Sequence, residues 1–149
     1  MDGLKIRRME NRDLDAVCRI EEETFSLPWS RKAFRDSLSL YHTIFLVAEL
    51  DGKIAGYCGG YQSLEEAEIT NVAVQKDLRR RGIARALLEE FIRAGTAQGA
   101  FAYTLEVRVS NKAAIRLYES LDFQSVGIRK NFYDKPREDA MIMWRHWQK

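Results

Sequence analysis

Apolar and polar residues alternate along the chain in segments that are typical of strands and helices. Segments rich in β-branched and aromatic residues predict seven strands, at 5–9, 43–49, 54–62, 69–74, 103–109, 124–129 and 138–144. Apolar residues at helical spacing predict four helices, one capped by Asn11 and ending near 23, one capped by Ser30 and ending near 38, one at 83–98, and one at 112–121 capped by Asn111. The predicted order is one strand, two helices, three strands, a helix, a strand, a helix and two strands.

This order predicts the α/β class, with a mixed central sheet of about seven strands and helices on both faces. The strand, helix and strand between 69 and 109 form a crossover, which makes the two strands parallel. Asp51-Gly52 predicts a tight hairpin, and Gly99 is well placed to end the long helix. With 149 residues and no proline-rich or glycine-serine tract, we expect one domain spanning 1–149.

Charge and composition exclude several classes of protein. The 24 basic and 22 acidic residues give a net charge of only +2, so charge offers no argument for nucleic-acid binding. No stretch approaches the roughly 20 apolar residues of a membrane span. Cys18 and Cys58 have no metal-binding spacing, so we expect free thiols and no metal. We therefore expect a cytoplasmic protein without a membrane or nucleic-acid partner.

The segment 69–98 predicts a strand, a basic glycine turn and an amphipathic helix in immediate succession. The first N–H groups of a helix have no internal partner and carry a partial positive charge, so they attract phosphate. Gly82 leaves the backbone bare where a diphosphate would approach, and Arg79, Arg80 and Arg81 add long-range attraction. The turn has neither the three glycines of a dinucleotide fingerprint nor a Walker Gly-Lys-Ser/Thr sequence. From these residues alone, a plain basic helix cap is an equally good interpretation.

Three other residues carry both a structural and a functional interpretation. Glu106 lies in a strand on the opposite face from Leu105 and Val107, where an outward, solvated carboxylate is as frequent as a functional one. Tyr118 fits the apolar side of a helix, where tyrosines are more often core residues. Trp29 lies in a loop, and such tryptophans more often cover a core than contact a ligand.

Several short motifs resemble the GCN5-related N-acetyltransferases (GNAT), and among them the bacterial RimI type. They are Arg79-x-x-Gly82-x-Ala84, Phe25-x-x-Pro28-Trp29-Ser30, Thr70-Asn71-Val72-Ala73-Val74, Leu105-Glu106-Val107-Arg108, Ser110-Asn111-x-x-Ala114-x-x-Leu117-Tyr118 and Arg137-Glu138-Asp139-Ala140. The resemblance covers nearly the whole chain and implies the acyl-CoA N-acyltransferase fold. The chain departs from the pattern at Asp122, where glycine is usual, and at Phe132, where tyrosine is common.

The resemblance implies a cosubstrate, acetyl-CoA, and a set of site residues. The cofactor-binding residues implied are Val72, Ala73 and Val74 along the pantetheine arm, Arg79, Arg80, Arg81, Gly82, Ile83, Ala84 and Arg85 at the pyrophosphate, and Asn111. Glu106 is implied as the general base, directly or through a water, and Tyr118 as the acid that protonates the leaving thiolate. Trp29 and Tyr133 are implied as acceptor-binding residues.

The function that the resemblance implies is acetylation of the α-amine of an N-terminal alanine, on a small-subunit ribosomal protein. Two alternatives stay open at this point: an acetyltransferase for a polyamine-like small molecule, and an acyl-CoA-binding module without activity. Retention of Glu106 and Tyr118 counts against the module. The loops at 25–30 and 131–137, which the family uses to receive a peptide, count against the polyamine. The sequence leaves the oligomeric state open, and a monomer is compatible with it.

Overall fold

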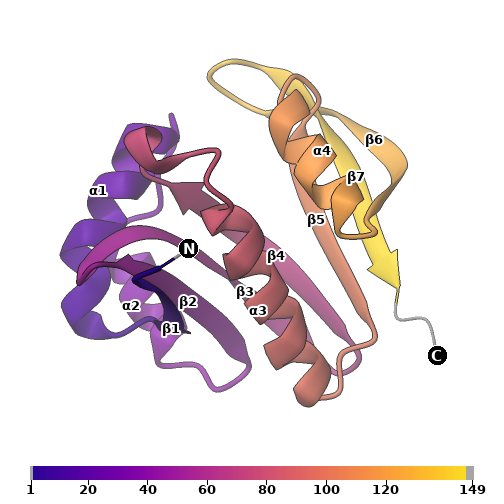
Figure 1. Cartoon of the computed structure of the whole chain (residues 1–149). Coiled ribbons are helices and arrows are strands. Elements are labelled where there is room, and N and C mark those ends of the chain that lie inside the picture. The colour runs from indigo at the N-terminus through magenta and orange to yellow at the C-terminus, as the bar shows by residue number, and fades with distance from the viewer. Residues whose placement is uncertain (1, 147–149) are drawn as a thin grey trace.

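The computed structural model describes residues 2–146, which form a seven-stranded sheet with helices on both faces (Figure 1). The strands are β1 (Leu4–Arg8), β2 (Thr43–Leu50), β3 (Lys53–Ser63), β4 (Glu66–Val74), β5 (Ala102–Arg108), β6 (Gln124–Tyr133) and β7 (Glu138–His146). The α-helices are α1 (Leu14–Thr24), α2 (Arg31–Leu38), α3 (Ile83–Ala97) and α4 (Lys112–Ser120), with short 3-10 helices η1 (Asn11–Asp13) and η2 (Lys76–Leu78). The predicted order of strands and α-helices is confirmed.

The strand order across the sheet is β1-β2-β3-β4-β5-β7-β6. Neighbouring strands are antiparallel except β4 and β5, which are parallel as the crossover predicts. Asp51 and Gly52 both have positive φ, at 51° and 84°, so the predicted tight turn joins β2 to β3. β1 and β6 therefore form the two edges of the sheet.

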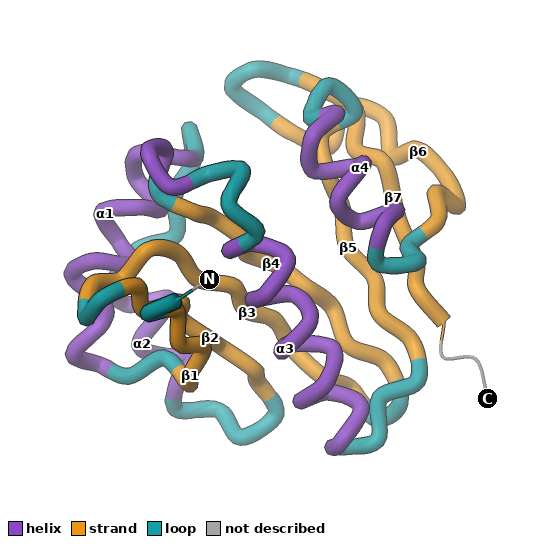
Figure 2. Tube along the Cα trace, viewed as in Figure 1, coloured by secondary structure: helices purple, strands orange, loops and turns teal. Residues whose placement is uncertain are grey.

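The sheet separates two apolar layers, because alternate strand residues point to opposite faces. On one face Ile44 and Leu46 of β2 belong to a cluster with Leu87 and Phe91 of α3 and Tyr118 of α4. On the other face Phe45 and Val47 pack with Val17 of α1 and Phe34 of α2. Figure 2 shows α3 and α4 lying over the near face of the sheet. Helices on both faces of the sheet are thus confirmed. The strands that carry the predicted site are packed between the two apolar layers.

Glycines in β3 allow the neighbouring strands to approach closely, and β4 has a bulge at Thr70. A Cβ atom on Gly60 would lie 1.9 Å from the carbonyl oxygen of Glu68, and one on Gly59 would lie 2.1 Å from the ring of Phe45. Gly60 pairs with Ile69 and Gly59 with Asn71, so Thr70 is the extra residue on β4. A bulge bends the strand that carries it, and this one lies where β4 begins to leave β5.

Several of the predicted boundaries are wrong, including the start of β4, which is Glu66 and not 69. Asn11 does not cap α1, because it opens η1, and Glu10 and Asp13 form a capping box there before α1 begins at Leu14. The last two strands extend beyond the predicted ends at 129 and 144, and Tyr133 still pairs with Glu138. Residues 130–133 are polar or exposed because β6 is an edge strand, so their pattern resembles a loop. The predicted loop of 130–137 is therefore only a short turn.

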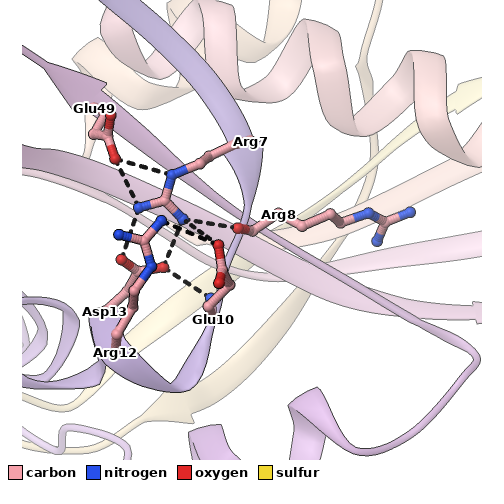
Figure 3. A network of polar contacts seen from close by, with 6 residues as sticks. All are labelled: Arg7, Arg8, Glu10, Arg12, Asp13 and Glu49. Atoms are coloured by element: carbon pink, nitrogen blue, oxygen red, sulfur yellow. Dashed lines mark hydrogen bonds and ion pairs between the residues drawn. The ribbon is translucent and has the colours of Figure 1, made fainter. Parts of the chain in front are cut away.

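A buried charge network joins β1, β2 and the start of α1 (Figure 3). The Arg7 guanidinium donates two hydrogen bonds of 2.8 Å to Asp13, and bonds of 2.9 and 2.8 Å to Glu49. Asp13 also accepts from the backbone N–H of Glu10 at 2.8 Å. Burial alone would raise the pKa of Asp13, but the bonds from Arg7 and Glu10 outweigh it and lower that pKa. The network therefore stabilises the fold with Asp13 ionised.

Candidate active site

The parallel strands β4 and β5 diverge, and most of the predicted site residues lie around this divergence. They pair only where Glu66 to Glu68 face Ala102 to Thr104. β5 pairs with β7 along its whole length on its other side, whereas 69–74 of β4 has, among the described residues, strand partners only in β3 (Figure 1). Backbone groups along this edge of β4 are left without a strand partner, and such groups must bond to something else.

The turn after β4 presents unpaired amides at the start of α3. Arg80 and Gly82 both adopt the left-handed conformation, with φ of 65° and 83°. The first backbone bond of the helix runs from Ala86 N–H to the Gly82 carbonyl at 3.0 Å. Within the described residues, the N–H groups of Ile83, Ala84 and Arg85 make no backbone hydrogen bond. A Cβ atom on Gly82 would meet nothing within 4 Å, so the approach to these amides is open.

Two of the predicted cofactor-binding arginines have internal partners. Arg79 Nε donates to the Val74 carbonyl at 3.1 Å, which ties the turn to the end of β4. Arg85 Nη1 donates to Ser120 Oγ at 2.7 Å, which ties α3 to the end of α4. Arg80 and Arg81 are exposed. The structure therefore divides these arginines into two that hold the turn in place and two that only supply charge beside it.

Val72, Ala73 and Val74 lie on the part of β4 that has left β5. They pair on their other side with Cys58, Tyr57 and Gly56 of β3. The side chains of Val72 and Val74 pack into the α3 layer and that of Ala73 into the opposite layer. What these residues present toward the divergence is therefore their backbone.

Asn111 is the N-cap of α4, as predicted. Its Oδ1 accepts from the Ala114 N–H at 3.2 Å, and the residue is exposed. The cap occupies the carbonyl oxygen, so the amide nitrogen is the part of Asn111 left for a ligand.

Tyr118 is buried in the α3 layer, with its ring centre 6.0 Å from that of Phe123. Within the described residues its hydroxyl makes no hydrogen bond. Burial raises the pKa of Tyr118, and the neighbouring Tyr133 and Cys58 raise it further. The residue therefore combines a core ring with a neutral hydroxyl that has no competing partner.

Glu106 lies on the face of β5 opposite to Leu105 and Val107, as predicted. Its side chain is only 20% exposed, so it is not the solvated carboxylate that the spacing alone allowed. Arg129 Nη1 lies 3.0 Å from Oε2 of Glu106. This contact has the distance of an ion pair but not the angles of a hydrogen bond, and Oε2 is otherwise buried without a hydrogen-bond partner among the described residues.

Tyr133, at the end of β6, interacts electrostatically with both Glu106 and Tyr118. Burial raises its pKa to about 12, the charge of Glu106 contributes to this rise, and Arg108 opposes it. Tyr133 in turn raises the pKa of Tyr118, so it is within electrostatic range of both residues. Glu106 and Tyr118 themselves lie on opposite faces of β5, because Tyr118 packs in the layer of Leu105 and Val107.

Arg108 is a residue of this site that the sequence analysis missed. Its guanidinium carbon lies 4.4 Å from the centre of the Tyr133 ring. The same group donates to the carbonyls of Pro136 and Asp134, at 2.8 and 3.1 Å, and so holds the β6–β7 turn. Arg108 follows Glu106 by two residues on one strand, so both side chains lie on the same face. This spacing is the sequence feature that could have identified Arg108.

Trp29 packs into the α1–α2 layer instead. Its ring centre lies 5.2 Å from that of Phe34 and 6.1 Å from that of Phe45. Its backbone N–H donates to Glu21 Oε2 at 2.9 Å, and the other oxygen of Glu21 accepts from the Tyr57 hydroxyl. None of the contacts described for Trp29 is made with Glu106, Tyr118 or Tyr133. Buried Glu21 was also missed, although its place on the apolar side of α1 marks it as unusual.

A cavity of about 420 Å³ lies between α3 and α4, bordered among others by Arg85, Ile92 and Arg145. It meets the predicted cofactor residues at Arg85 alone and includes neither Glu106 nor Tyr118. Among residues 2–146 no group of three or more His, Cys, Asp or Glu is arranged to hold a metal ion. Over the same residues, no helix has the length and apolar character needed to cross a membrane.

The mixed sheet with two diverging parallel strands, beside a glycine turn that presents free amides, has the arrangement expected of the GNAT class. The model of the Acetyltransferase (GNAT) family matches residues 14–123, and the chain belongs to this family. The resemblance and the fold class expected from the sequence are thereby confirmed, and the protein is an N-acetyltransferase.

Two of the similar proteins are named for one acceptor in particular. The chain is 41% identical to the [ribosomal protein bS18]-alanine N-acetyltransferase of Escherichia coli (strain K12), over 93% of this chain and 94% of the relative. The crystal structure of the ribosomal-protein-S18-alanine N-acetyltransferase from Escherichia coli has a TM-score of 0.90 and 38% identity, covering 98% of this chain and 95% of that one. Ard1 from Thermoplasma volcanium has a TM-score of 0.90 and 27% identity, covering 99% of both chains.

Proposed function

We propose that the protein transfers the acetyl group of acetyl-CoA to the α-amine of an N-terminal alanine, on a small-subunit ribosomal protein. The observation that carries this proposal is the 41% identity, over almost the whole of both chains, to a relative named as an alanine N-acetyltransferase of ribosomal protein bS18. Glu106 on β5, which diverges from β4, and Tyr118 on α4, which follows β5, supply the two groups that this reaction needs.

The residues present fit acetyl-CoA. The free N–H groups of Ile83, Ala84 and Arg85 form an anion site at a helix N-terminus, open above Gly82, where the pyrophosphate would be held. The unpartnered edge of β4 at Val72 and Val74 offers backbone groups to the amides of the pantetheine arm. When bound, acetyl-CoA supplies an acetyl group activated as a thioester.

Two proton transfers are assigned to side chains of this chain. Glu106 accepts a proton from the acceptor amine, directly or through a water, and its carboxylate lies largely buried beside the diverging strands. Tyr118 donates the proton that the departing thiolate requires. Its raised pKa makes the phenol a weaker acid than usual, so close positioning must supply much of its effect.

The chemistry of amines favours a chain terminus over a lysine as acceptor. At pH 7 an α-amine with a pKa near 8 is roughly one-tenth neutral, whereas a lysine with a pKa of about 10.4 is neutral in about four molecules per ten thousand. A terminal amine therefore loses its proton to Glu106 more easily than a lysine does. Glu22 and Glu23 are exposed at the end of α1, and basic residues further along the acceptor would meet them there.

Mass spectrometry of three acceptors incubated with acetyl-CoA tests the proposal. The first is an Ala-initiated peptide with a free terminus and no lysine, the second is the same peptide with a blocked terminus and one internal lysine, and the third is a polyamine. We expect acetylation of the first alone. Preferential modification of the second would make the protein a lysine acetyltransferase, and preferential modification of the third would make it a small-molecule enzyme.

A further inference from the structure

Arg129 covers the carboxylate of Glu106 from the edge of the sheet. Arg129 of β6 pairs with Ala140 of β7, which pairs with Arg108 of β5, so these three side chains share one face. Glu106 lies two residues before Arg108 and therefore on the same face. Ala140 is fully buried and small, which leaves Arg129 room to reach across β7 to Glu106.

The ion pair between Arg129 and Glu106 is close but weak. Arg129 Nη1 lies 3.0 Å from Glu106 Oε2, yet the angles do not make a hydrogen bond. The Arg129 side chain is 55% exposed, and its guanidinium carbon lies 5.1 Å from the centre of the exposed Phe132 ring. Ion pairs with an exposed partner contribute little, so Arg129 can leave Glu106 at small cost.

An acceptor ammonium that approaches Oε2 of Glu106 meets Arg129 there. At pH 7 about nine-tenths of the α-amine is ammonium, and this cation is the form that first meets the site. Two cations at hydrogen-bond distance from one carboxylate oxygen repel each other. The ammonium can donate directed hydrogen bonds to Oε2, which Arg129 does not do.

We propose that Arg129 is a positioning residue that acts as an exchangeable counter-ion of Glu106. It neutralises and covers the carboxylate in the free enzyme, and the ammonium group of the acceptor displaces it. This inference rests on the proposed function of Glu106. It follows that Arg129 opposes acceptor binding but takes no part in the steps after binding.

Steady-state kinetics of Arg129→Met with an Ala-initiated peptide, at saturating acetyl-CoA, tests this inference. We expect the KM for the peptide to fall roughly two- to fivefold, which is the range that an exposed ion pair supports, while kcat stays within about twofold. The control is Lys130→Met, which removes the same charge from the next position of β6, where the side chain is exposed and makes no ion pair among the described residues. Its KM and kcat should match those of the wild type.

A double variant shows whether the effect passes through Glu106. In a Glu106→Gln background, peptide affinity measured by calorimetry in the presence of CoA should no longer change on Arg129→Met. A KM that rises or stays unchanged in Arg129→Met would overturn the inference, as would a large fall in kcat, an equal effect of Lys130→Met, or an effect that survives in the Glu106→Gln background. If the wild type itself does not acetylate the peptide, the proposed function fails, whereas acetylation by the wild type with any of these results refutes only the counter-ion.

Discussion

Replacing Gly82 by alanine should separate the anion site of the turn from the stability of the fold. Gly82 has a φ of 83°, and a Cβ atom there would meet nothing within 4 Å. The added methyl group therefore clashes with nothing in the free protein. It would, however, stand beside the unpaired N–H groups of Ile83 and Ala84, where a pyrophosphate is proposed to bind. Alanine is preferred to valine because a β-branched residue at positive φ is a more severe strain.

The expected magnitudes follow from two separate effects. The left-handed conformation costs an alanine about 1–2 kcal/mol, part of which is offset because alanine has less freedom than glycine in the unfolded chain, so about 1 kcal/mol of stability should be lost. That loss corresponds to roughly 2–4 °C in Tm for a chain of this size. Displacing one charge-assisted bond between an amide and phosphate costs about 1.5–3 kcal/mol, which raises the Kd for acetyl-CoA about tenfold or more.

Gly99 is the matched control at the other end of the same helix. It has a φ of 98° and also has nothing within 4 Å of a Cβ atom, so Gly99→Ala carries the same strain without touching the proposed site. Thermal denaturation should show similar losses for both variants, and calorimetry should show weaker acetyl-CoA binding for Gly82→Ala alone. Wild-type affinity in a folded Gly82→Ala protein, or an equal loss in Gly99→Ala, would refute the assignment of the turn.

Three further variants test the site and the fold. Tyr118→Phe should lower kcat roughly 100-fold or more with little change in acetyl-CoA affinity, and wild-type turnover would make Tyr118 a core residue only. Asp13→Asn should cost about 2 kcal/mol at pH 7 in urea unfolding. Because the pKa of Asp13 is lowered on folding, its contribution to stability is complete above the ordinary pKa of about 3.9 and is lost as pH falls through the folded value. A stability difference between variant and wild type that does not shrink below about pH 4 would contradict this role of Asp13. Asp122→Gly should add up to about 1 kcal/mol, since Asp122 has a φ of 70° at the position where the family usually has glycine, and a loss of stability would count against strain there.

Local rules account for the part of this protein that its sequence determines by itself. The order of elements follows from apolar periodicity, which reports the face that each segment buries. The caps at Ser30 and Asn111 and the hairpin at Asp51-Gly52 depend on contacts within three or four residues, so each was predictable and each is confirmed. Gly99 ends α3 with positive φ for the same reason.

Residues distant in sequence decided the rest. Whether Glu106 is solvated depends on Arg129, which lies two strands away across the sheet, and no spacing within β5 reports that contact. The packing of Trp29 depends on Phe45 of β2 and on buried Glu21, and not on its own loop.

The divergence of β4 from β5 likewise depends on long-range pairing. The parallel crossover fixed the direction of both strands, but their pairing ends at Glu68 and Thr104, next to the bulge at Thr70. Strand register is set by contacts between chain segments that come together only in the folded state, so the local pattern predicted the strands and only the tertiary structure placed the site between them.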